Sequence, residues 1–251
     1  MSGHSHWATI KRKKGAADAK KGKIFTRLAR EIVIATREGG GDPSMNVRLE
    51  LAIDKAKAAN MPKDSIDRAI KRGTGEDKEG VEYEEILYEG YATNGIALMI
   101  ECVTENRNRT VAELRHILSK AGGGMGDPGS VSWQFDRRTY FALSSEAHDF
   151  DTIFELAVEA GAEDIQQDDE LIEIIGLPNS FKDIADHLTK ANIKPEDSGI
   201  RYMPKQEITL DLEKTLKVMK AIETLEELDD VQNIYSNLSI SEDAILAMEN
   251  N

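Results

Sequence analysis

The residues with the clearest chemistry are cations near the start of the chain. Four consecutive basic residues occupy positions 11–14, and Trp7 precedes them. Long flexible cations neutralise phosphates and release counterions, which gives affinity for nucleic acid with little dependence on its sequence. An aromatic ring beside such a run can stack on unpaired bases. We therefore expect residues 1–17 to form a flexible basic arm that contacts nucleic acid.

Basic residues continue beyond this arm. Between Lys11 and Arg37 there are ten basic residues and two acidic ones. A helix face that is merely solvated usually mixes both signs, so this excess favours contact with a polyanion. For Arg107 and Arg109, in the loop 105–110, contact with phosphate and pairing with neighbouring carboxylates are both open. The predicted nucleic-acid-binding residues are Trp7, Lys11, Arg12, Lys13, Lys14, Lys20, Lys21, Lys23, Arg27, Arg30, Arg107 and Arg109.

The two parts of the chain carry opposite net charges. Residues 1–72 hold 17 Lys and Arg against 8 Asp and Glu, a net charge of 17 − 8 = +9. Residues 73–251 hold 15 against 38, a net charge of 15 − 38 = −23, so the whole chain has −14. A basic module on an acidic body is typical of a protein that uses one end to meet a polyanion.

Other kinds of site have weaker support. The glycine-rich stretch 122–129 follows an expected helix and precedes an expected strand, whereas phosphate-binding loops follow a strand and open a helix. We interpret it as a helix cap and flexible loop. Cys102 lies in an apolar run and is expected to be a small buried hydrophobe. His4 and His6 alone make a weak metal site. We expect no enzymatic activity, no metal and no cofactor.

The composition also bears on the compartment. No run approaches the roughly 18 apolar residues that cross a bilayer, and no apolar segment follows the N-terminal charges as in a secretory signal. A single cysteine excludes an internal disulfide. Together these features favour a cytoplasmic protein without membrane contact. They do not predict the oligomeric state.

Three helices are expected to position the basic residues. Apolar residues recur at helical spacing over 18–37, with Lys23, Arg27 and Arg30 on the opposite side. Two further helices are expected at 44–59 and 63–72, and Gly73 is expected to follow the last of them as its C-terminal cap. Three helices with short breaks predict a small bundle.

Strands alternate with helices after the polar linker 73–80. Thr110 begins a capping-box pattern and is expected to cap a helix. The region 139–203 has the order strand–helix–strand–strand–helix–strand, typical of a ferredoxin-like unit. The last elements can complete the sheet begun at 85–135, which would make the middle domain discontinuous. Expected strands are 85–92, 96–104, 130–135, 139–143, 163–167, 171–175, 199–203, 207–212 and 231–235, and expected helices are 111–121, 149–160, 180–191 and 213–226.

The predicted fold class is α+β. An N-terminal three-helix bundle is followed by two α/β domains, the last ferredoxin-like and inserted in the middle one. The predicted parts are a basic arm at 1–17, a helical domain at 18–78, a discontinuous α/β domain at 79–136 plus 206–251, and a ferredoxin-like domain at 137–205.

Several segments resemble the YebC/PmpR family, which includes the mitochondrial translational activator of cytochrome oxidase. The resemblance implies a three-domain fold and a bacterial cytoplasmic protein without enzymatic activity. The segments are SGHSHWATIKRKKGAADAKKGKIFTRLAREI (2–32), NMPKDSIDRAIKRG (60–73), YEGYATNGIALMIE (88–101), ENRNRT (105–110) and GGGMGDPGSVSWQF (122–135).

The resemblance leaves two functions in competition. Family members have been labelled DNA-binding transcriptional regulators, and others act in translation, at the ribosome. The sequence has no clear recognition helix rich in Asn, Gln and Arg, so specificity for DNA would come from shape or oligomerisation. A cationic arm with an aromatic residue suits irregular RNA as well. We predict a DNA-binding transcriptional regulatory protein, with a ribosome-associated translation factor that binds RNA as the alternative.

Overall fold

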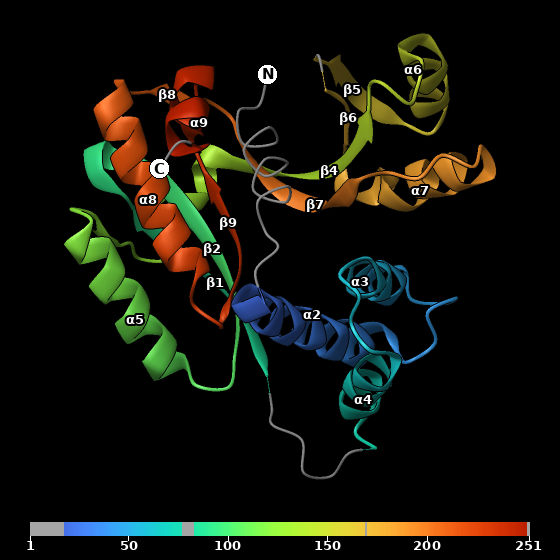
Figure 1. Cartoon of the computed structure of the whole chain (residues 1–251), viewed down its shortest axis with the longest axis horizontal. Coiled ribbons are helices and arrows are strands. Elements are labelled where there is room, and N and C mark those ends of the chain that lie inside the picture. Colours follow the sequence, from blue (N-terminus) through green and yellow to red (C-terminus); the bar gives the residue numbers. More distant parts are fainter. Residues whose placement is uncertain (1–17, 77–82, 169, 250–251) are drawn as a thin grey trace. The chain divides into compact units, whose positions relative to one another are not determined.

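The computed structural model describes residues 18–76, 83–168 and 170–249. Three helices come first, and two four-stranded sheets with flanking helices and a two-stranded sheet follow, which confirms the predicted α+β class (Figure 1). The described chain forms two compact units. Trp133–Glu207 make up the smaller one, here called the inserted unit. The main unit consists of the described residues before Trp133 and after Glu207.

The first three helices form a bundle within the main unit. They are α2 (Asp18–Gly39), α3 (Val47–Ala58) and α4 (Lys63–Thr74). Asn46 joins two of them, because its side chain accepts a hydrogen bond from the Leu49 amide as the N-cap of α3 and donates to the Ala35 carbonyl of α2, at 2.7 Å. The bundle core contains Ile32, Val33, Leu49, Ala52, Ile53, Ala56, Met61, Ile66 and Ala69.

The position of Gly73 differs from the prediction. It lies inside α4, and Gly75, with φ 78°, takes the left-handed conformation that ends the helix. A Cβ atom added at Gly73 would lie 2.5 Å from the Thr36 Cβ atom. Gly73 is therefore explained by the close approach of α4 to α2, which spacing along the sequence does not reveal.

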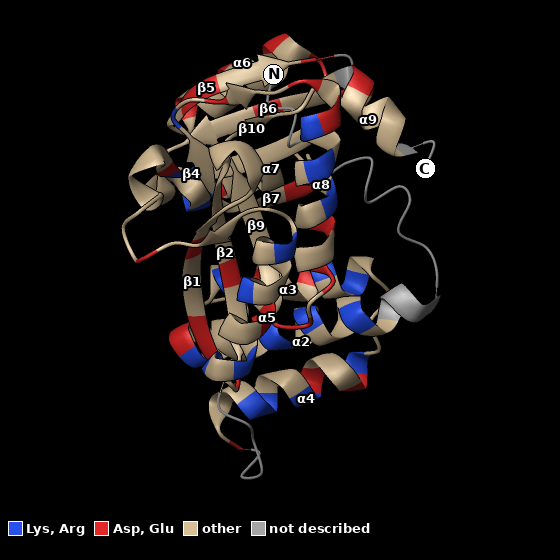
Figure 2. Ribbon diagram, turned by 90° about the vertical axis from the view of Figure 1, so that its left-hand side faces the viewer, with Lys and Arg blue, Asp and Glu red and all other residues tan. Residues whose placement is uncertain are grey.

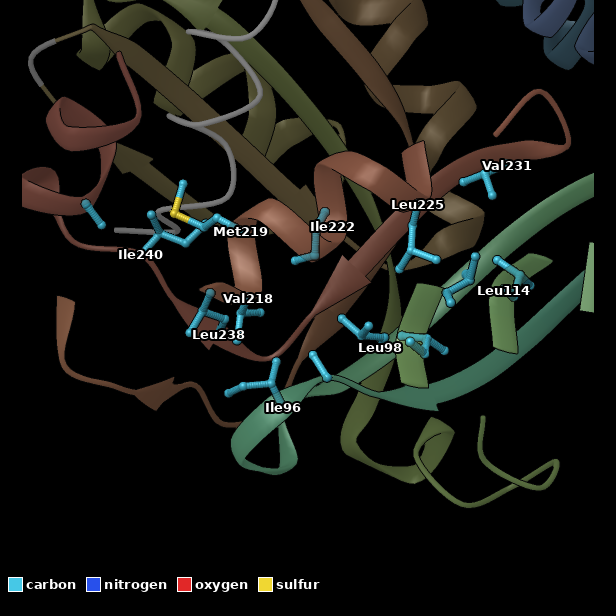
Figure 3. Packing of buried hydrophobic residues seen from close by; sticks show 14 of the residues in the cluster. Ile96, Leu98, Leu114, Val218, Met219, Ile222, Leu225, Val231, Leu238 and Ile240 are labelled. Atoms are coloured by element: carbon cyan, nitrogen blue, oxygen red, sulfur yellow. The ribbon is translucent and has the colours of Figure 1, made fainter. Parts of the chain in front are cut away.

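The main unit also contains an antiparallel sheet with the order β3-β1-β2-β9. Helices α5 and α8 contribute to one hydrophobic core with β2 and β9 (Figure 3). A short pair of strands, β8 and β10, and helix α9 complete the unit. The bounds are β1 (Glu84–Tyr91), β2 (Ala97–Thr104), α5 (Arg107–Lys120), β3 (Gly124–Met125), β8 (Ile208–Thr209), α8 (Leu212–Glu226), β9 (Val231–Ser236), β10 (Leu238–Ser239) and α9 (Glu242–Glu249).

Three details of this sheet and its helices differ from the prediction. The expected strand 130–135 is mostly a loop with a 3-10 turn at Ser132–Gln134. The expected strand 207–212 is reduced to β8, which pairs with β10 and not with the main sheet. Helix α5 begins at Arg107 and is capped by the side chain of Asn106, not by Thr110. The Thr110 hydroxyl instead donates to a buried carboxylate far along the chain.

The inserted unit has an antiparallel sheet with the order β5-β6-β4-β7. This strand order, with helix α6 between β4 and β5 and helix α7 between β6 and β7, is that of the predicted ferredoxin-like fold. The Phe141 ring of β4 stacks on Phe181 of α7, with ring centres 4.8 Å apart. The bounds are β4 (Phe135–Ser144), α6 (Phe150–Glu159), β5 (Ala162–Gln167), β6 (Leu171–Gly176), α7 (Phe181–Lys190) and β7 (Asp197–Pro204).

A buried carboxylate fixes the glycine-rich loop before the inserted unit. Glu89 of β1 is 8% exposed and accepts hydrogen bonds from the amides of Gly129, Val131 and Ser132, at 2.7, 2.6 and 2.9 Å. Burial raises the pKa of Glu89, but these amide hydrogen bonds bring the pKa below its ordinary value. The end of the loop is thus an anchored turn, in place of the flexible segment that its glycines suggested.

We expect Glu89→Gln to destabilise the main unit by about 1–3 kcal/mol, because the amide side chain cannot accept all three hydrogen bonds. Since its pKa is lowered in the folded state, Glu89 contributes stability above the ordinary glutamate pKa and loses that contribution as the pH falls through the folded pKa. Urea unfolding between pH 3 and pH 7 measures both effects. Asp127→Asn, at an exposed position of the same loop, is the control; equal losses of stability in the two variants would contradict this role of Glu89.

Candidate nucleic-acid interface

The predicted nucleic-acid-binding residues fall into three groups. Trp7 and the basic residues 11–14 lie outside the described residues. Lys20 and Lys21 lie on the first turn of α2. The remaining members, Lys23, Arg27, Arg30, Arg107 and Arg109, have described side chains and all belong to the main unit.

Two arginines of α2 face the sheet of the main unit. Arg30 is 8% exposed, and its guanidinium donates to the Val103 carbonyl at 3.2 Å, to the Asp229 carbonyl and to the Asp230 carboxylate. Arg27 donates to the Gln232 carbonyl, and burial lowers the pKa of this arginine. The sequence suggested that this side of α2 is open to phosphates. In the structure, the guanidinium groups of these two residues are instead directed to acceptors within the chain.

Lys23 lies on the same side of α2 and is exposed. Its ammonium group donates one hydrogen bond to the Glu227 carbonyl, at 3.0 Å. An ammonium group has three donors, so this contact leaves two for a solvent or phosphate oxygen. On this side of α2, the ammonium group of Lys23 is therefore accessible to solvent or to a ligand, unlike the guanidinium groups of the two arginines.

Asp230, which directly precedes β9, connects three elements of the main unit. Its carboxylate lies 2.9 Å from Arg30 of α2 and accepts two hydrogen bonds from Arg109 of α5, at 3.0 and 3.1 Å. It also accepts from the hydroxyl groups of Thr104 and Thr110, at 3.0 and 2.7 Å. Burial raises the pKa of Asp230, but the hydrogen bonds and the charges around it bring the pKa below its ordinary value. We call these five residues the Asp230 junction.

The two arginines of the 105–110 segment are paired with acids. Arg109 contacts Asp230 and also Glu105, at 3.5 Å, and its side chain remains 42% exposed. Arg107 pairs with Glu84 of β1 and remains 65% exposed. Pairing with carboxylates, one of the two interpretations that the sequence left open, is therefore present in the structure. Contact with nucleic acid through their exposed sides stays a prediction.

Helix α4 carries exposed cations that are missing from the predicted set. Lys63, Arg68 and Lys71 are exposed, and none of them forms an ion pair within the described part of the chain. Arg68 donates only to the Asp64 carbonyl of its own helix, at 3.2 Å. Figure 2 shows Lys and Arg along α4. The sequence contains these cations, but Lys71 lies in the last turn of α4, where a cation also suits the helix dipole and so does not stand out.

Arg48 of α3 provides a contrast with these exposed cations. It contacts Glu31, Glu38 and Glu85 at 3.0, 2.6 and 3.0 Å, so three carboxylates neutralise one guanidinium. Burial lowers the pKa of Arg48, but the neighbouring carboxylates raise it by more, so the pKa lies above its ordinary value. The network links the bundle to β1. A basic residue in this position serves the fold and offers little to a phosphate.

The described residues offer little support for other chemistry. Cys102 is fully buried in β2, and burial raises the pKa of its thiol to about 12, so it stays protonated at neutral pH. Within 18–76, 83–168 and 170–249, no three His, Cys, Asp or Glu residues are placed to hold a metal ion. The helices in those ranges are too short or too polar to span a membrane.

Comparison with known proteins gives a consistent picture. The family model for the TACO1/YebC protein N-terminal domain matches residues 5–76, and the model for the TACO1/YebC second and third domain matches residues 83–238. A "Probable transcriptional regulatory protein" of Geobacter sulfurreducens is 51% identical over 241 residues, covering 96% of this chain and 97% of its own. One from Acidithiobacillus ferrooxidans (strain ATCC 53993 / BNL-5-31) is 51% identical over 249 residues, covering 99% of both chains. The crystal structure of a conserved hypothetical protein from Aquifex aeolicus has a TM-score of 0.85 and 43% identity, covering 94% of this chain and 98% of that one.

We expect Asp230→Asn to destabilise the main unit by about 3 kcal/mol or more, because Arg30 would keep a buried charge without its counterion. Since the pKa of Asp230 is lowered in the folded state, its contribution is present above the ordinary aspartate pKa and is lost as the pH falls through the folded pKa. Urea unfolding at pH 7 and in acid measures both effects.

The matched control is Asp229→Asn, one residue earlier, where the side chain is exposed. An exposed substitution of this kind usually changes stability by less than about 0.5 kcal/mol. If Asp230→Asn were as mild as this control, the Asp230 junction would not stabilise the unit.

Proposed function

Since the chain belongs to the TACO1/YebC family, we propose that it is a non-enzymatic regulator of gene expression that binds nucleic acid, with DNA as its first target. The names of its relatives as probable transcriptional regulatory proteins support a regulatory role. Binding is assigned to the main unit, through the α2–α4 bundle and the residues that precede it.

The observation that carries this proposal is the set of exposed, unpaired cations on the bundle. Lys63 and Lys71 of α4 are exposed and form no ion pair within the described ranges, and Lys23 retains free donors. Such side chains lose little solvation when a phosphate replaces water, and they release counterions from the nucleic acid. The inserted unit, by contrast, holds 7 Lys and Arg against 17 Asp and Glu and would be repelled by a polyanion.

The proposed contacts are with the phosphate backbone. The exposed face of α4 alternates Lys and Arg with Asp64 and Asp67, and it presents no Asn or Gln to base edges. Lys and Arg on phosphates fix orientation but carry no direct information on base sequence. Binding would therefore depend strongly on salt and weakly on sequence, with any selectivity coming from nucleic-acid shape.

A ribosome-associated translation factor is the second candidate. The observation that favours it is the same lack of Asn and Gln on α4, because structured RNA is recognised largely through shape and phosphates. The basic segment 11–14 with Trp7 also suits unpaired bases in irregular RNA. In this case the exposed cations of the bundle would contact ribosomal RNA in place of duplex DNA.

We expect the double variant Arg68→Glu/Lys71→Glu to bind duplex DNA and structured RNA more weakly at low salt. For duplex DNA, the slope of log affinity against log salt should become shallower by about 0.9 for each phosphate that is no longer neutralised. Fluorescence anisotropy over a salt series measures both quantities. Neither side chain takes part in an ion pair within the described ranges, so the fold should be retained, and circular dichroism checks this.

The control is Lys182→Glu/Lys190→Glu on α7, two exposed positions in the acidic inserted unit. It changes the net charge of the chain by the same amount as the α4 variant. If α4 forms a specific basic surface, the α4 variant loses more affinity for nucleic acid than the α7 variant does. Equal losses of affinity would mean that only total charge matters, and the assignment to α4 would be abandoned.

Gradient sedimentation of a cell lysate separates the two targets. On the DNA proposal, the protein stays out of the ribosomal fractions at low and moderate salt and binds a duplex when purified. Nuclease treatment and a variant with Glu at positions 11–14 serve as controls. Migration with ribosomes that is abolished in this variant would reject DNA as the first target in favour of the translation factor.

A further inference from the structure

Helix α6 of the inserted unit has two apolar sides. Ile153 and Ala157 are fully buried and form the side that packs within the unit. A helix that covers a single sheet needs one such stripe. The second stripe consists of Phe150, Phe154 and Val158, spaced four residues apart on another side of the helix.

This second stripe is exposed. The exposed fractions are 45% for Phe154 and 50% for Val158, and Phe150 is half-buried against Phe154 with ring centres 5.9 Å apart. Single exposed apolar residues are common on protein surfaces, but a contiguous row with two aromatic rings is a feature of binding sites. The row is long enough to receive two turns of a helix.

Acidic residues run beside the stripe. Asp151, Glu155 and Glu159 each follow one residue after a member of the stripe, so they form a parallel row on the helix. All three are exposed, and α6 contains no Lys or Arg. The surface is therefore an apolar row with negative charge along one edge.

The charge of this surface restricts what can bind it. Phosphate groups of nucleic acid or of an anionic lipid surface would meet the row of carboxylates and be repelled. Two copies of α6 packed antiparallel about a two-fold axis would place carboxylates beside carboxylates, which disfavours such a dimer through this helix. A helix with apolar residues on one side and Lys or Arg beside them satisfies both the stripe and the acidic row.

We propose that the outer side of α6 docks a basic amphipathic helix of another protein. Phe154 and Val158 supply the apolar contact, and Asp151, Glu155 and Glu159 pair with the cations of the partner. This surface lies in the inserted unit, is separate from the cations of the α2–α4 bundle, and does not depend on the nucleic-acid target.

The test uses the full chain and a fluorescent helical peptide of Leu and Lys, with Leu on one side only. We expect binding that weakens with salt, and at least about a tenfold loss of affinity for Phe154→Ser/Val158→Ser, in line with hot-spot residues at interfaces. A peptide with Glu in place of Lys should not bind. The variant should retain the thermal midpoint and nucleic-acid binding of the parent chain.

The matched control is Leu212→Ser on α8, which removes an apolar side chain of similar exposure, 46%, from the main unit. It should bind the Leu/Lys peptide as the parent does. Equal affinity of the parent, the α6 variant and this control would overturn the proposal, because the peptide would then be held by total charge alone. Analytical ultracentrifugation adds a second criterion: self-association that the α6 variant abolishes would assign the stripe to a second copy of the chain and overturn the docking of another protein.

Discussion

The arrangement of the main unit depends on one buried carboxylate. Asp230 is 3% exposed and is surrounded by two guanidinium groups and two hydroxyl groups from α2, β2 and α5. Taking a carboxylate out of water is costly unless its oxygens are fully used, and this one accepts at both oxygens. The junction therefore holds the α2–α4 bundle against the sheet with directional contacts, which hydrophobic packing alone does not provide.

The same junction decides which cations remain available. Arg30 is engaged in the junction, and Arg109 partly so. Elsewhere on the bundle, Arg48 is neutralised by two glutamates of α2 and one of β1. Lys63 and Lys71 of α4 have no such partner within the described ranges. Positive charge in the first part of the chain thus has two uses. Arginines with their forked donors join the bundle to the sheet, and on the proposed function the exposed lysines contact the nucleic acid.

Local patterns predict the elements well, because periodicity and turn residues act over a few positions. The helix over 18–37 and the succession of strands and helices along the inserted unit follow from such patterns. Contacts between distant segments are not predictable in this way: Arg30 and Asp230 are 200 positions apart, so nothing near Arg30 in the sequence distinguishes it from an exposed arginine. Thr110 has the sequence of a capping residue, but its hydroxyl turns to Asp230. Gly73 has the sequence context of a residue that ends a helix. In the structure it lies inside α4, where the close approach to α2 leaves no room for a Cβ atom. In each case the tertiary neighbour determines how the residue is used.

Segregation of charge supports the proposal that the two units have different partners. A polyanion favours the bundle with its unpaired lysines and disfavours the inserted unit, whose acids exceed its bases by 17 − 7 = 10. On the same grounds, the inserted unit favours a cationic partner. Its helix α6 combines carboxylates with an exposed apolar row, and a basic amphipathic helix can match both. On these proposals the chain binds a nucleic acid and a basic helix of another protein, through two surfaces that cannot exchange partners because their charges are opposite.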